Sequence, residues 1–124
     1  MTKILLVFAG GGLGAVCRFL LTTVLAGKLG NFPLGTLAAN FFGSLLMGLL
    51  VGILAGRFES VRLFVAVGFL GGFTTFSSFS AETIALINGG QIFSAAVNII
   101  VSVAASLAAC ALGLKIGSYN FGGI

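Results

Sequence analysis

The sequence predicts an all-α integral membrane protein with four transmembrane helices, the third of them broken. The chain has 124 residues, of which 59% are hydrophobic and only 6% are charged, whereas soluble domains carry roughly 25% charged residues. Apolar stretches long enough to cross about 30 Å of hydrocarbon, roughly 20 residues each, recur along the chain. They are Ile4–Leu25, Leu34–Ala55, Leu63–Ile87 and Ile92–Leu114. Because only short connectors separate them, we expect residues 1–124 to form a single transmembrane domain.

The first stretch follows Lys3 and could be mistaken for a secretory signal. The apolar core of a signal is about 7–15 residues long, but this run continues past Arg18 toward Leu25, which indicates a retained helix. A charged residue inside a span costs about 2.5–3.5 kcal/mol on insertion scales and usually faces a bundle interior or cavity. Arg18 therefore either faces inward or extends to the membrane surface.

The second stretch carries small residues four positions apart, Ser44, Gly48, Gly52 and Gly56. This spacing places them on one helical face, where they allow another backbone to approach closely. Helix packing is the simplest interpretation. Four helices would hardly shield a broken span and its polar groups from lipid, so we expect self-association, with Gly48, Gly52 and Gly56 as a plausible seam.

The third stretch departs most from a regular helix. Its glycines, Gly68, Gly71 and Gly72, weaken the helix, and the hydroxyls that follow compete for its backbone hydrogen bonds. We expect two half-helices joined between Gly71 and Thr75. Irregular backbone at membrane depth is tolerated only beside protein or a wet cavity, so the functional site is expected here.

Aromatic and polar side chains alternate through the same segment. In a continuous helix, Phe69, Phe73, Phe76 and Phe79 would share one face. Aromatic rings have positive edges, so rings interleaved with hydroxyls could hold a small anion. On a neighbouring face, the same spacing places Thr75, Ser78 and Glu82.

The fourth stretch has a ladder of small and polar residues. They are Ser94, Asn98, Ser102, Ser106 and Cys110. The ladder fits either small-residue packing with interhelical hydrogen bonds or a hydroxyl track beside an aqueous path. Asn98 favours an inward-facing stripe, since an amide facing lipid would be costly.

Charge and composition exclude several classes of protein. The sequence has no histidine and two isolated cysteines, Cys17 and Cys110, so no zinc-type ligand cluster is present. The net charge of +4 is thinly spread, which argues against nucleic acid binding. The sequence shows no nucleophile–base pair and no phosphate loop, which argues against an enzyme.

The distribution of the positive charges predicts how the chain is oriented in the membrane. Lys3, Arg57, Arg62 and Lys115 fall on one side of a four-span chain and Lys28 on the other. The positive-inside rule therefore predicts that both termini are cytoplasmic. Separately, we expect the protein to lie in the cell inner (plasma) membrane.

Three motifs in spans one to three resemble those of the small bacterial Fluc (CrcB-type) fluoride channels. They are Gly12-Leu13-Gly14-Ala15-Val16-Cys17-Arg18, Gly35-Thr36-Leu37-Ala38-Ala39-Asn40-Phe41-Phe42-Gly43 and Gly71-Gly72-Phe73-Thr74-Thr75-Phe76-Ser77-Ser78-Phe79. The resemblance covers nearly the whole chain. It implies a passive channel that exports cytoplasmic fluoride and reduces its toxicity, built as an antiparallel, dual-topology homodimer with two pores. Dual topology requires both orientations, whereas the charge count favours one.

The resemblance also implies a role for individual residues. Ring edges of Phe76 and Phe79 and the amide of Asn40 would contact fluoride. The hydroxyl track would comprise Ser78, Thr36, Ser102 and Ser106, with Glu82 near a pore end and Arg18 in a vestibule. A structural sodium ion at the dimer centre would bind the backbone carbonyls of Gly71 and Thr74 of both subunits.

Two other functions remain open at this stage. A small four-helix, proton-coupled antiporter exporting cations or drugs would use Glu82 as its exchanging carboxylate. A structural membrane peptide or assembly factor would transport nothing.

Overall fold

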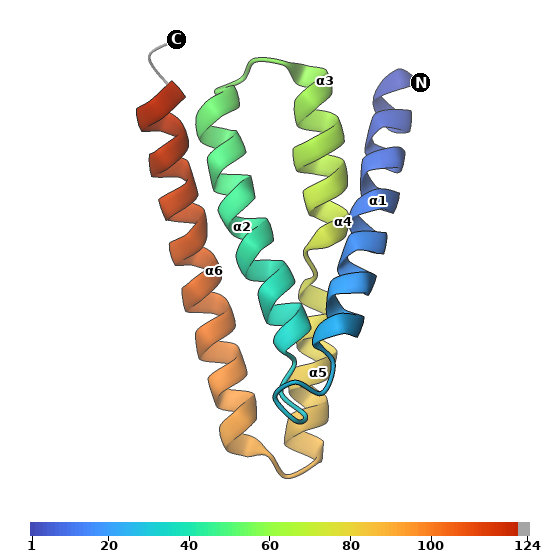
Figure 1. Cartoon of the computed structure of the whole chain (residues 1–124), viewed down its shortest axis with the longest axis vertical. Coiled ribbons are helices and arrows are strands. Elements are labelled where there is room, and N and C mark those ends of the chain that lie inside the picture. Colours follow the sequence, from blue (N-terminus) through green and yellow to red (C-terminus); the bar gives the residue numbers. More distant parts are fainter. Residues whose placement is uncertain (122–124) are drawn as a thin grey trace.

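The computed structural model describes residues 1–121, which are helical apart from short connectors (Figure 1). The elements are α1 (Thr2–Leu25), α2 (Leu34–Leu54), α3 (Glu59–Val61), η1 (Arg62–Leu70), α4 (Gly71–Phe73), α5 (Phe76–Asn88) and α6 (Ile92–Phe121). Four helical segments are long and apolar enough to cross a membrane: α1, α2, the series from α3 to α5, and α6. The predicted all-helical, four-span architecture is confirmed.

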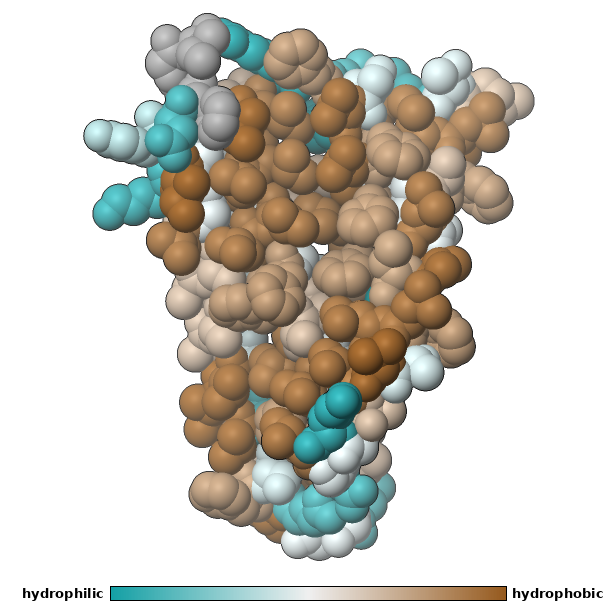
Figure 2. All heavy atoms as spheres, in the orientation of Figure 1, coloured by the Kyte–Doolittle hydropathy of each residue, from teal (hydrophilic) through white to brown (hydrophobic). Residues whose placement is uncertain are grey.

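The start of α1, the end of α6 and the connection between α2 and α3 lie at one end of the bundle, and the other two connections lie at the opposite end (Figure 1). On the face shown in Figure 2, hydrophobic residues cover the middle of the molecule and hydrophilic ones gather toward its two ends. An exposed ion pair, from Lys3 Nζ to Glu59 Oε1 at 2.7 Å, joins the start of α1 to α3. This distribution is that of a multi-pass membrane protein.

Glycines bring α1 into backbone contact with the first half of the third span. A Cβ built on Gly10 or Gly14 would collide with the carbonyl oxygens of Phe64 and Phe69, respectively. A Cβ on Gly72 would likewise collide with the carbonyl of Gly11. Small residues permit this close approach, and the contact holds the broken span against α1.

The glycines of α2 pack within the same chain. A Cβ on Gly48 would collide with the Cys110 carbonyl of α6, and one on Gly52 would lie 2.7 Å from the Ser118 nitrogen. Glycines of α6, Gly113 and Gly117, meet α2 in the same way. The expected seam between subunits is therefore wrong for Gly48 and Gly52, because α6 already covers them.

Gly56, the third residue of the expected seam, lies beyond the end of α2. It has a positive φ of 86°, and nothing lies within 4 Å of a Cβ built on it. It serves the turn that leaves α2, since glycine adopts this conformation without steric cost.

The third span is interrupted where expected. Thr74, with ψ of 155°, and Thr75, with φ of −154°, are extended between α4 and α5. The break also divides the aromatic residues into two pairs. Phe69 and Phe73 stack with ring centroids 5.9 Å apart, and Phe76 and Phe79 form a tilted pair at 5.3 Å.

Two features of the helices differ from the sequence prediction. The segment Arg62–Leu70 winds as a π-helix rather than an α-helix. The fourth helix continues to Phe121, seven residues past the expected end at Leu114. Its 30 residues span about 45 Å at 1.5 Å per residue, so part of it extends beyond the hydrocarbon layer.

Candidate functional site

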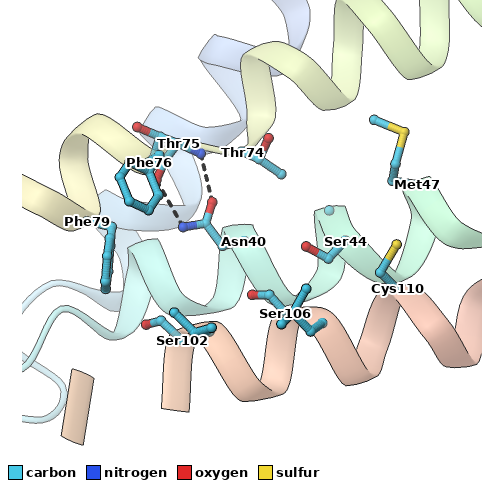
Figure 3. Close-up of a pocket in the computed structure, with 13 residues that line it drawn as sticks. Asn40, Ser44, Met47, Thr74, Thr75, Phe76, Phe79, Ser102, Ser106 and Cys110 are labelled. Carbon is cyan, nitrogen blue, oxygen red and sulfur yellow. Dashed lines mark hydrogen bonds between the residues drawn. The ribbon is translucent and has the colours of Figure 1, made fainter. Parts of the chain in front are cut away.

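The extended backbone at the break is held by one side chain from α2. Asn40 Oδ1 accepts a hydrogen bond from the Thr75 N–H at 2.7 Å, and Asn40 Nδ2 donates to the Thr75 carbonyl at 3.0 Å (Figure 3). The amide thus satisfies both backbone groups of a residue that has left the helix. Without such a partner these groups would be costly at membrane depth.

Hydroxyls on either side satisfy further groups of the break. Thr75 Oγ1 accepts from the Ser78 N–H at 3.1 Å and so caps the first turn of α5. The Thr74 hydroxyl donates to the Leu70 carbonyl at 2.9 Å. The break is therefore a built structure rather than a loosened helix.

Arg18 reaches the break from α1. Its Nε donates to the Gly72 carbonyl at 3.1 Å, and its Nη1 donates to Ser78 Oγ at 3.4 Å. The side chain therefore faces the bundle, which decides against extension to the membrane surface. Within residues 1–121, Arg18 forms no ion pair with Glu82.

A cavity of about 370 Å³ lies between α2, the break and α6 (Figure 3). Five of the predicted site residues line it: Asn40, Phe76, Phe79, Ser102 and Ser106. Thr74, also predicted, lines it too, together with Gly43, Ser44, Met47, Thr75, Val103, Leu107 and Cys110. The fold therefore brings together aromatic rings, an amide and hydroxyls from three spans.

The two aromatic rings occupy different positions in the cavity. The Phe79 side chain is 8% exposed and lies inside, whereas Phe76 is 75% exposed at the outer edge. The ring planes are inclined by 48°. In a single chain the cavity is therefore open to the side of the bundle.

The hydroxyls of α6 differ in their hydrogen bonding. Ser102 Oγ donates to Asn98 Oδ1 at 3.1 Å. The Oγ atom of Ser106 is buried and has no partner within the described part of the chain. Asn40 Nδ2 retains a second N–H besides the one directed at Thr75, since an amide nitrogen carries two. Donors for an anion are thus present on α2 and α6.

The remaining predicted residues lie elsewhere. Thr36 Oγ1 donates to Glu82 Oε1 at 2.8 Å, and Glu82 lines a second cavity of about 220 Å³ with Asn31 and Gln91 of the connectors. The other carboxylate oxygen, Glu82 Oε2, is buried without a partner in the region described. Ser78 lies on the Arg18 side of α5 rather than in the cavity of about 370 Å³ beside α6. Of these two cavities, we call the latter the larger cavity.

Thr75 has two roles that were not predicted from the sequence, as cap of α5 and as partner of Asn40. A threonine directly before a new helix is a preferred N-cap, and this signal could have indicated the first role. The second role joins residues 35 positions apart, and nothing local in the sequence announces it. The place of Ser44 and Met47 in the cavity was missed as well.

The sequence is similar to a known protein family and to several named proteins. Residues 5–114 match the family described as CrcB-like protein, Camphor Resistance (CrcB). A fluoride-specific ion channel FluC of Novosphingobium aromaticivorans is 51% identical over 94% of this chain and 96% of its own length. FluC of Agrobacterium fabrum is 46% identical over 98% and 100%, and FluC of Coxiella burnetii 45% over 93% and 97%.

Proposed function

Because the chain belongs to the CrcB-like protein family, we propose that it is a fluoride-selective ion channel rather than an enzyme. It lets cytoplasmic fluoride leave passively across the cell inner (plasma) membrane and so reduces fluoride toxicity. The observation that carries this proposal is identity of 45–51% to proteins named as fluoride-specific channels over at least 93% of the chain.

The larger cavity offers the chemistry that fluoride needs. Fluoride is small and tightly hydrated, so a pore must replace its water with donors at close range. The second N–H of Asn40, the Ser106 hydroxyl and the edges of Phe76 and Phe79 are such donors. Several weak sites also allow the ion to leave, which conduction requires.

Residues outside the larger cavity extend the path. Glu82 and Thr36 stand near the connectors and mark a pore end. Arg18 places a positive charge beside the break and attracts anions into a vestibule, while Ser78 adds a hydroxyl next to it. Charged side chains inside membrane spans commonly mark ion pathways in this way.

A second copy of the chain completes the pore. The larger cavity opens to the side of the bundle, with Phe76 three-quarters exposed. Lipid against these amide and hydroxyl groups would be costly, because hydrocarbon supplies no hydrogen bonds. An antiparallel, dual-topology homodimer covers both cavities and forms two pores.

A structural sodium ion fits at the centre of this dimer. The carbonyl oxygens of Gly71 and Thr74 accept no hydrogen bond from any described residue. Nothing lies within 4 Å of a Cβ built on Gly71, so this position is open to a partner. Carbonyls freed by a helix break are suitable ligands for Na⁺, and two copies would supply four.

Ion efflux from liposomes containing the purified protein tests the channel proposal. We expect rapid fluoride efflux, negligible chloride efflux and no accompanying proton exchange. Proton-coupled export of a cation would instead identify an antiporter, and the absence of any ion flux would indicate a structural role. Either result would refute the proposed function.

A further inference from the structure

A series of three hydrogen bonds runs from α6 to α5, and the middle one joins the two helices. Ser102 Oγ donates to Asn98 Oδ1 at 3.1 Å, Asn98 Nδ2 donates to Thr83 Oγ1 at 2.9 Å, and Thr83 Oγ1 donates to the Phe79 carbonyl at 2.7 Å. The three side chains are buried, with exposed fractions of 6% for Ser102, 1% for Asn98 and 6% for Thr83. We call this series the Thr83–Asn98–Ser102 relay.

The Phe79 carbonyl fixes the direction of the relay, because a carbonyl can only accept. Thr83 donates its single proton to that carbonyl, so its oxygen has only lone pairs left for Asn98. Asn98 must then turn its nitrogen toward Thr83 and its oxygen toward Ser102. Ser102 in turn donates its single proton to Asn98.

The relay therefore leaves Ser102 without a proton for the cavity that it lines. Ser102 presents only lone pairs there, which do not attract an anion. Ser106, one turn further along α6, lines the same cavity and has a buried oxygen with no partner in the described chain. Of these two hydroxyls, only that of Ser106 is free to donate.

We propose that Asn98 is a positioning residue that acts through Ser102. By directing the Ser102 proton away from the cavity, the relay keeps fluoride weakly held at this point, so that the ion can leave. The inference rests on the proposed function and adds two residues, Thr83 and Asn98, that do not line the larger cavity.

The substitution Thr83→Val tests the relay because valine keeps the shape and removes the hydroxyl. Asn98 then has no acceptor to orient it, and its amide can rotate to donate to Ser102, whose proton turns to the cavity. The half-saturating fluoride concentration for flux in liposomes should fall about tenfold, as expected for one added hydrogen bond to a charged group. Maximal flux should fall as well, because the ion leaves more slowly.

Thr83→Ser is the matched control, since serine restores the hydroxyl. It should leave both the half-saturating concentration and the maximal flux close to wild type. A role limited to helix packing would change stability without this separation of the two parameters.

Ser102→Ala shows whether the effect passes through Ser102. Once Ser102 is alanine, adding Thr83→Val should no longer lower the half-saturating concentration, so the double variant should match Ser102→Ala alone. If Thr83→Val does not assemble, Asn98→Leu replaces it, because leucine also releases the Ser102 proton. An unchanged concentration in the variant used, or the same fall without Ser102, would refute the relay alone. Absence of fluoride flux from the wild type would refute the proposed function and the relay together.

Discussion

At the scale of single residues, Asn40 combines two tasks. It holds the break by pairing with both backbone groups of Thr75, and it lines the larger cavity, where we propose that its second N–H binds fluoride. A side chain with this double role should tolerate almost no substitution. Other residues of the cavity, such as Ser44, line it without holding the break.

The substitution Asn40→Asp should abolish fluoride flux. A carboxylate cannot donate to the Thr75 carbonyl, and its negative charge repels the anion. Asn120→Asp makes the same chemical change at the exposed end of α6 and should leave flux unchanged. Liposome efflux of both variants, with their dimer content measured by size-exclusion chromatography, checks this. Wild-type flux in Asn40→Asp would remove Asn40 from the site.

Ser106 should matter more than its neighbours on the ladder of α6. Ser106→Ala removes a buried hydroxyl that has no other partner among the described residues, and it should raise the half-saturating fluoride concentration about tenfold. Ser94→Ala, on the same ladder but outside the larger cavity, is the control. Equal effects of the two variants would contradict the assignment.

At the scale of elements, glycine packing sets the position of the broken span. The contact of α1 with η1 and α4 leaves no space for a side chain at Gly14. Gly12, on the same helix, has nothing within 4 Å of an added Cβ. These two positions therefore separate packing from helix propensity.

Gly14→Ala should destabilise the folded protein by about 1–3 kcal/mol, the usual cost of overpacking. Gly12→Ala should be neutral or slightly stabilising, because alanine favours the helix without a clash. Thermal unfolding in detergent measures both. A Gly14→Ala variant as stable as wild type would show that α1 and the third span do not pack as described.

Several elements could be predicted from local sequence, and others depended on contacts that sequence does not display. Apolar length located the four spans, and the glycines and hydroxyls of residues 71–75 located the break. The π-helix of η1 has no local signature that distinguishes it from an α-helix. The partners of Gly48 and Gly52 were misassigned because small-residue spacing predicts a close neighbour but not which one.

The same limit applies to the site. The third-span motif predicted Phe76 and Phe79, and the fourth-span ladder predicted Ser102 and Ser106. The fold gathers all four with Asn40 in one cavity. The sequence could not predict which serine hydroxyl of α6 has a proton to donate to the cavity. That depends on hydrogen bonds among Phe79, Thr83 and Asn98 in three dimensions.

At the scale of the whole molecule, two features of the single chain support the proposed dimer. Its polar cavity opens sideways, and no described residue donates a hydrogen bond to the carbonyls of Gly71 and Thr74 in the interrupted segment beside it. The proposed partner subunit would account for both features. The dimer and the sodium ion should therefore be linked in stability.

Replacing sodium by N-methylglucamine should lower the thermal stability of the detergent-solubilised dimer. An ion that binds only the folded dimer stabilises it by mass action, and the organic cation is too large for a carbonyl cage. Unfolding curves in sodium chloride and in N-methylglucamine chloride, at equal ionic strength, make the comparison. Identical curves would contradict a structural sodium ion.

The most direct test of the account is fluoride efflux through the double variant Phe76→Ile and Phe79→Ile, compared with wild type in the same liposomes. Isoleucine keeps apolar bulk but removes the positive ring edges. The account predicts that fluoride flux is lost while the dimer still assembles. Wild-type flux through this variant would contradict the claim that the broken third span binds fluoride through its aromatic rings.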